Sequence, residues 1–75
     1  MTKEAKEIAK EALGRCTPHV SNLEEMKDLL GRIVAEEETV EGILKALRER
    51  VTSAEVTFQT DLRILINEIL HLVRD

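Results

Sequence analysis

One apolar pattern near the C-terminus constrains this 75-residue chain more than any other feature. Between residues 53 and 74, apolar side chains recur at spacings of three and four, and on a helical wheel they fill one arc of about 120°. The members of this stripe are Phe58, Leu62, Leu65, Ile66, Ile69, Leu72 and Val73. The pattern predicts a long helix whose broad apolar face must pack against other elements.

Shorter apolar stripes with the same spacing predict further helices over about 3–13, 22–37 and 39–50. The face of the first of these is mostly alanine. One proline and three glycines punctuate the chain, and no alternation of apolar and polar residues indicates a strand. The sequence therefore predicts one all-α domain over 1–75, a small bundle of three or four helices.

Local signals predict where these helices begin and end. Ser21 with Glu24, and Thr52 with Glu55, have the spacing of a capping box, in which a hydroxyl and a carboxylate satisfy exposed backbone amides at a helix start. Gly14 is placed to end the first helix in a left-handed conformation. We therefore expect boundaries at these three positions.

The boundary between the second and third helices has conflicting signals. The acidic run at residues 36–38 suits a helix start, and Thr39 can cap one. Residues 35–39 contain none of the glycine, proline, asparagine or aspartate that turns prefer. We expect a break or kink here, with one continuous helix as the alternative.

A long helical rod or coiled coil is the alternative to the bundle. Apolar residues on one seven-residue register run through much of the chain, namely Leu23, Leu30, Leu44, Val51, Phe58, Leu65 and Leu72. The register fails at Glu37, Asp61 and Glu68. A rod over residues 22–74 would be about 80 Å long and would leave the first helix little to pack against. The bundle is the favoured prediction.

The small size of the chain predicts self-association. A chain this short has a small core, and its single cysteine cannot form an internal disulfide. The C-terminal stripe therefore offers more apolar surface than 75 residues are expected to cover, and symmetric dimers are the commonest solution. We expect a homodimer whose interface contains Phe58, Leu62, Leu65, Ile69, Leu72 and Val73.

The function expected from these features is a non-enzymatic protein–protein interaction module, such as an adaptor, an inhibitor or an assembly subunit. No motif brings an acid, a base and a nucleophile together, and no cofactor-binding motif is present. A partner other than a second copy has one candidate surface, the acidic group Glu36, Glu37, Glu38 and Glu41.

A small transcriptional regulator or nucleic-acid-associated protein is the first alternative function. Its candidate surface is the short basic segment over residues 45–50. A net charge of −4 and the lack of tyrosine and tryptophan argue against nucleic acid as a partner, because such binding relies on clustered cations and on aromatic stacking.

A metal-binding bundle is the second alternative. Glu68 and His71 form a Glu-x-x-His pair on the last predicted helix, a pattern that di-iron bundles use twice. A symmetric dimer would supply two such pairs, with Glu37 as a further carboxylate. Cys16 and His19 also have a metal-ligand spacing, but a structural zinc site needs four ligands.

The expected location is the cytoplasm. The N-terminal residues contain acidic side chains and no apolar run of the length that a signal peptide needs. A single cysteine needs no oxidising compartment. With 35% charged residues, the sequence predicts no membrane span.

Overall fold

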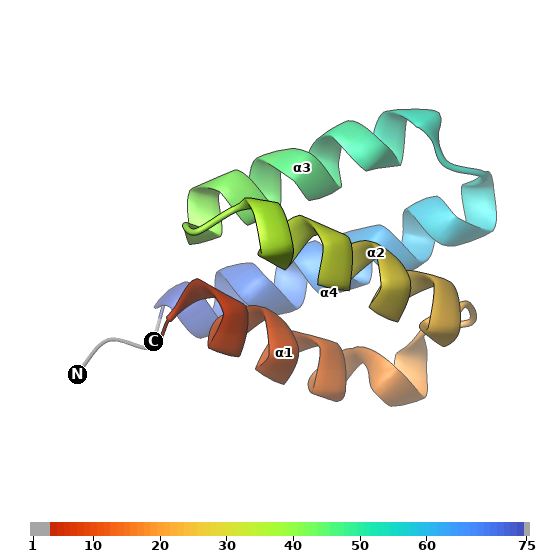
Figure 1. Cartoon of the computed structure of the whole chain (residues 1–75). Coiled ribbons are helices and arrows are strands. Elements are labelled where there is room, and N and C mark those ends of the chain that lie inside the picture. The colour runs from red at the N-terminus through yellow and green to blue at the C-terminus, as the bar shows by residue number, and fades with distance from the viewer. Residues whose placement is uncertain (1–3, 75) are drawn as a thin grey trace.

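The computed structural model describes residues 4–74, which form four α-helices and one short 3₁₀-helix (Figure 1). In chain order these are α1 (Ala5–Cys16), η1 (Thr17–His19), α2 (Leu23–Glu36), α3 (Val40–Ser53) and α4 (Val56–Arg74). No strand occurs among the described residues. The predicted all-α class is confirmed.

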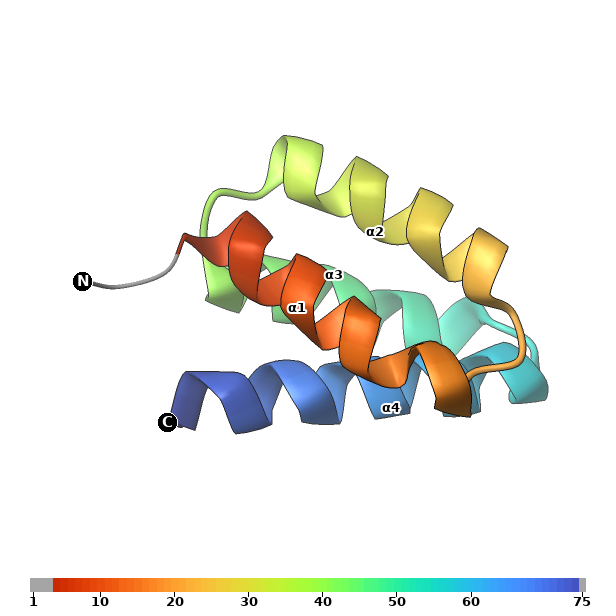
Figure 2. The ribbon, with the colours of Figure 1, turned by 90° about the horizontal axis from the view of Figure 1, so that it is seen from below.

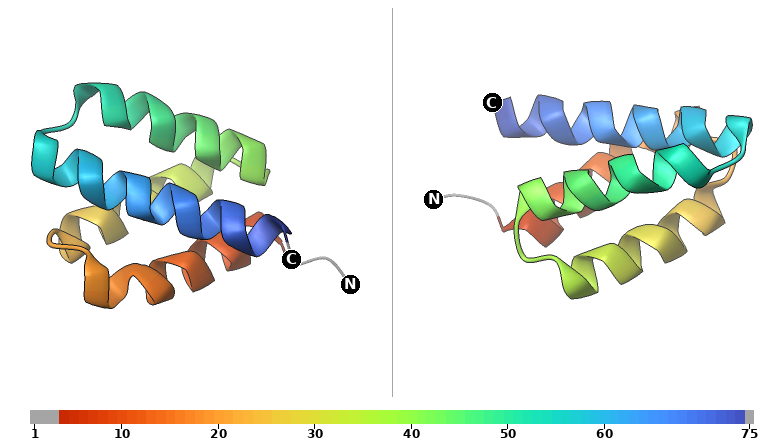
Figure 3. Two further views of the ribbon diagram at one scale, coloured as in Figure 1. Left: turned by 180° about the vertical axis from the view of Figure 1, so that it is seen from behind. Right: turned by 90° about the horizontal axis from the view of Figure 1, so that it is seen from above.

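The four helices pack as a compact bundle in which successive helices run in opposite directions (Figures 1 and 3). The helices α1 and α3 touch each other, and both contact α4 on one side and α2 on the other (Figure 2). The bundle measures 37 × 24 × 19 Å. A rod of about 80 Å would be more than twice as long. The rod alternative is therefore wrong.

Each helix turns one apolar stripe towards a common core. The buried apolar residues are Ala9, Ala12 and Cys16 of α1, Met26, Leu30 and Ile33 of α2, Ile43, Leu44 and Leu47 of α3, and Phe58, Leu62, Leu65, Ile66 and Ile69 of α4. The members contributed by α1 are small, so its backbone can approach a neighbour closely. The most extensive contact of α1 is with α4.

The prediction that the first helix ends at Gly14 is wrong. The helix continues to Cys16, and no described glycine has a positive φ. Continuing the helix buries Cys16 completely, whereas Gly14 stays exposed inside the helix. The burial of Cys16 therefore outweighs the local preference of Gly14 for a helix end. Thr17 follows as the C-cap, and its hydroxyl donates a hydrogen bond to the carbonyl of Leu13 at 3.1 Å.

The predicted capping box of Ser21 and Glu24 is not formed. The N-cap of α2 is Asn22, without a hydrogen bond from its own side chain to the helix. Instead, the buried carboxylate of Asp61 in α4 accepts hydrogen bonds from the backbone amides of Ser21 at 3.2 Å and Asn22 at 2.9 Å, and from Nδ2 of Asn22 at 3.1 Å. A distant carboxylate thus binds the loop that leads into α2.

The predicted break between the second and third helices is confirmed. The helix α2 ends at Glu36, and α3 begins at Val40. Thr39 is the N-cap of α3, and its hydroxyl oxygen accepts a hydrogen bond from the backbone amide of Gly42 at 3.0 Å. The cap at Thr39 therefore starts the new helix without any glycine or proline in the turn.

The boundary between α3 and α4 lies later than the sequence predicted. The helix α3 continues through Thr52, whose hydroxyl donates to the carbonyl of Glu49 at 2.7 Å, so Thr52 caps no helix start. The side chain of Gln59 instead satisfies the end of α3, since its Nε2 donates to the carbonyls of Val51 at 2.9 Å and Ala54 at 3.0 Å. The predicted capping box of Thr52 and Glu55 is therefore absent, and a side chain from α4 caps the end of α3 instead.

Candidate functional site

The predicted dimer interface lies mostly inside the protomer. Phe58, Leu62, Leu65 and Ile69 are at most 5% exposed, because α1 and α3 cover α4. Leu72 is half-buried, and Val73 is 49% exposed. The expectation that 75 residues cannot cover this face is therefore wrong. A second molecule can reach Leu72 and Val73, but not the other four, without opening the bundle.

The four glutamates of the predicted acidic surface lie around the turn between α2 and α3. Glu36, Glu38 and Glu41 are exposed, whereas Glu37 is half-buried. The carboxylate of Glu37 lies in the space that a Cβ on Gly42 would occupy, in the first turn of α3. A carboxylate is favoured near a helix start, so the position of Glu37 agrees with the expectation that the acidic run suits the beginning of α3.

The basic segment over residues 45–50 lies on α3. Lys45, Arg48 and Arg50 are exposed, and Glu49 lies exposed among them. This edge therefore carries mixed charge rather than a continuous basic surface.

The candidate metal residues do not gather into one site. Among residues 4–74, no group of three or more histidine, cysteine, aspartate or glutamate side chains is placed to hold a metal ion. His19 is exposed in η1, while Cys16 is buried and lies near Glu68 of α4. Burial, followed by the negative charge of Glu68, raises the pKa of the Cys16 thiol to about 11. The thiol is therefore protonated at neutral pH.

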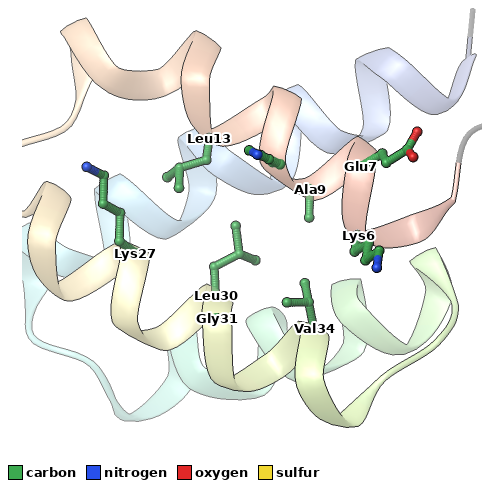
Figure 4. Close-up of a pocket in the computed structure, with 9 residues that line it drawn as sticks. Lys6, Glu7, Ala9, Leu13, Lys27, Leu30, Gly31 and Val34 are labelled. Atoms are coloured by element: carbon green, nitrogen blue, oxygen red, sulfur yellow. The ribbon is translucent and has the colours of Figure 1, made fainter.

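An apolar groove runs between α1 and α2, and we call it the α1/α2 groove (Figure 4). Its volume is about 370 Å³, and it is open to solvent along one side. Ala9 and Leu13 of α1 and Leu30, Gly31 and Val34 of α2 form its apolar lining. Figure 4 shows Leu13, Leu30 and Val34 directed into the space between the two helices. The groove is therefore a surface for hydrophobic contact.

The groove exists because α1 packs unequally on α4 and α2. Its contact with α4 is much more extensive than its contact with α2. Leu13 and Val34 consequently remain only half-buried, although both pack against the core. Gly31 adds no side chain, and a Cβ at this position would meet nothing within 4 Å. The space between the two helices is left unfilled by this chain.

Charged side chains border the groove. Lys6, Glu7 and Lys10 come from α1, and Lys27 comes from α2. In Figure 4, Lys27 lies near Leu13 at one end, whereas Lys6 and Glu7 lie at the other. A groove with an apolar lining and charged borders can bind an amphipathic surface that carries complementary charges.

A second, more polar hollow lies where the start of α2, the end of α3 and the start of α4 meet. Its volume is about 260 Å³, and its lining includes Asn22, Glu25, Arg50, Ser53 and Phe58. Phe58 itself is buried, so little apolar surface is offered there. The α1/α2 groove is the better candidate for an interaction site.

The α1/α2 groove was not predicted from the sequence, because every apolar stripe was expected to pack in a core or a dimer interface. One signal was present: Gly31 interrupts the interior of a helix where it costs about 1 kcal/mol relative to alanine. A second was the pair Lys6 and Lys10, like charges one turn apart that weaken a helix slightly. Neither signal identifies a groove until the placement of α1 and α2 is known.

Comparisons with known proteins give no relative: no protein-family model, no curated protein and no solved structure matches the chain. Within residues 4–74, every helix is too short or too polar to cross a lipid bilayer.

Proposed function

We propose that this protein is a non-enzymatic interaction module that receives an amphipathic helix of another protein in the α1/α2 groove. The observation that carries the proposal is the open apolar groove between α1 and α2, which lies beside the buried core. A helix laid along such a groove contacts it through side chains spaced three and four residues apart. The groove is too open to enclose a small molecule, as most small-molecule sites do.

A second copy is a poor occupant of the groove. In a two-fold symmetric dimer the same surface is used by both copies, so one groove would face the other groove and neither copy would offer a protruding surface to fill it. Elsewhere in residues 4–74, the exposed large apolar residues are Val56 and Val73, which lie near opposite ends of α4. A second copy therefore has little exposed apolar surface with which to fill the groove of the first.

Self-association through α4 remains a separate prediction. Its accessible members are Leu72 and Val73. A cytoplasmic location also belongs to the proposal, since the unpaired Cys16 thiol needs no oxidising compartment.

A titration followed by nuclear magnetic resonance tests the proposed function. The full chain, labelled with nitrogen-15, is titrated with a synthetic helix of about five turns that carries leucines at helical spacing and otherwise uncharged residues. We expect the largest amide shift changes over residues 6–13 and 27–34. Changes confined to other residues, or no changes at all, would contradict the proposal.

Two matched glycine variants provide the control. Gly31→Gln places a side chain in the groove, and Gly14→Gln places the same side chain on α1 outside the groove lining. Both glycines face open space in helix interiors, so both variants are expected to fold. We expect Gly31→Gln to weaken peptide binding by about tenfold or more and Gly14→Gln to leave it within about twofold. Equal effects of the two would place the binding site elsewhere.

A further inference from the structure

The charges along the α1/α2 groove are unevenly distributed. Lys27 lies near Leu13 at one end (Figure 4), and Lys10 of the lining precedes Leu13 by three residues, about one turn, on α1. At the end near Val34, Lys6 is accompanied by Glu7 and borders a hollow that also contains Glu4, Glu37 and Glu38. The groove therefore has a cationic end and an end of mixed, mainly acidic charge.

The lysines at the cationic end are not used to stabilise the fold. Lys10 and Lys27 are exposed, and neither forms an ion pair with any residue in 4–74. The neighbouring carboxylate of Glu11 lies 3.6 Å from the guanidinium of Arg15. Folding therefore leaves two cations free beside an apolar surface in a chain whose net charge is −4.

We infer that the helix that docks in the α1/α2 groove carries carboxylates at one end of its apolar stripe, and that this end lies beside Lys10 and Lys27. The inference rests on the proposed function and adds the chemistry and direction of the partner. Charge complementarity of this kind fixes the register of an interface and excludes partners of the wrong sign. A basic end would meet Lys10 and Lys27 with like charge.

The length of the groove sets the spacing on the partner. Lys27 and Val34 mark its two ends on α2 and are seven residues apart, which is about 10 Å at 1.5 Å per residue. A partner helix therefore spans the groove with about two turns. We expect its apolar residues within those two turns and its carboxylates at one boundary, with uncharged or basic residues at the other.

Two synthetic helices test the inference. They share the leucine stripe of the uncharged peptide, and one carries two glutamates at one end where the other carries two lysines. We expect the glutamate peptide to bind the full chain about tenfold more tightly than the lysine peptide at low salt, because each exposed charge pair changes binding only modestly. The difference should shrink at about 0.5 M salt, where exposed charges are screened.

Charge reversal in the protein provides the decisive control. The double variant Lys10→Glu/Lys27→Glu should prefer the lysine peptide, whereas Lys45→Glu, an exposed lysine on α3, should keep the wild-type preference. A spin label at the glutamate end should broaden amides near Leu13 more than amides near Val34. Equal binding of both peptides, an unchanged preference in the double variant, or the opposite broadening pattern would overturn the inference.

Failure of the inference can be separated from failure of the proposed function. If the uncharged peptide shifts residues 6–13 and 27–34 but the charged peptides bind equally, the groove is a docking site without the charge selection. If none of the three peptides binds, both ideas are wrong. If the chain sediments as a dimer that Gly31→Gln dissociates, a second copy occupies the groove and the inference is wrong.

Discussion

The contacts of α1 with α4 and with α2 differ in extent. Against α4, α1 forms the most extensive contact in the bundle, and Ala12 and Cys16 are completely buried. Against α2 its contact is smaller, and the half-buried Leu13 lines the α1/α2 groove together with Val34. We refer to these as the closed contact and the open contact of α1.

The difference shows that side-chain size on one helix can determine which neighbour it packs against. Small residues on α1 allow it to approach α4 closely, and the large buried residues of α4 fill the core between them. The larger Leu13 lies to one side and is left without a complete partner. A stable core and an exposed apolar groove thus arise from the same helix.

Removing the carboxylate of Asp61 should have the largest effect on this arrangement. Asp61→Ala leaves the amides of Ser21 and Asn22 without their acceptor, so the loop that positions α2 beside α1 loses its attachment to α4. We expect a loss of about 3 kcal/mol in the free energy of unfolding. Urea denaturation followed by circular dichroism measures it.

The variant Asp61→Asn is the control for Asp61→Ala. It keeps one acceptor oxygen but loses the charge, and we expect an intermediate loss of stability. Wild-type stability in Asp61→Ala would show that the carboxylate does not hold the α2 loop.

Raising the pH should destabilise the closed contact through Cys16. The folded state keeps the thiol protonated, with a pKa of about 11 against 9.0 for the free group. This contribution is therefore complete below about pH 9 and is lost as the pH rises through 11, a change of about 2–3 kcal/mol. The urea midpoints of wild type and Cys16→Ala, measured from pH 8 to 11, give the effect as a difference. Parallel pH profiles of the two proteins would contradict it.

A larger side chain in the closed contact should lower the free energy of unfolding slightly less than ionisation of Cys16 does. Ala12 is 0% exposed, so Ala12→Leu has no space for the added side chain. We expect a loss of about 2 kcal/mol in the free energy of unfolding, because overpacked cores shift their backbone or rotamers. Thermal unfolding measures the loss, and an unchanged midpoint would mean that the closed contact has spare room.

A methyl group added in the open contact should have the smallest effect, and it should raise the free energy of unfolding rather than lower it. A Cβ at Gly31 meets nothing within 4 Å, so Gly31→Ala gains the helix propensity of alanine, about 1 kcal/mol. Gly42→Ala is the contrasting variant, because its Cβ must displace the carboxylate of Glu37. A lower unfolding midpoint for Gly31→Ala would show that the open contact is already filled.

Much of the fold could be predicted from local patterns in the sequence. The four helices, the break before Thr39 and the buried face of α4 follow from apolar spacing and capping chemistry within a few residues. The helix ends at Gly14 and Thr52 were wrong for one shared reason. Burial of Cys16 and the reach of Gln59 depend on neighbouring elements, and these outweighed the local signals.

The candidate site depends on contacts between distant residues, and for this reason it could not be predicted. Asp61 was a disruption of a heptad pattern in the sequence, and its role appears only when α4 meets the loop at Ser21, 40 residues earlier. The groove likewise depends on how far α2 lies from α1. Its lining residues, including Leu30 and Val34, look in the sequence like any other core-facing stripe.

The relaxation of methyl groups by a soluble, uncharged paramagnetic agent tests the central claim most directly. In the full chain at low concentration, the methyl groups of Leu13 and Val34 should relax several times faster than those of Leu62 and Leu65, which are 0% exposed. Equal protection of all four residues would mean that the open contact is closed in solution, by repacking or by a second copy, and would contradict the account.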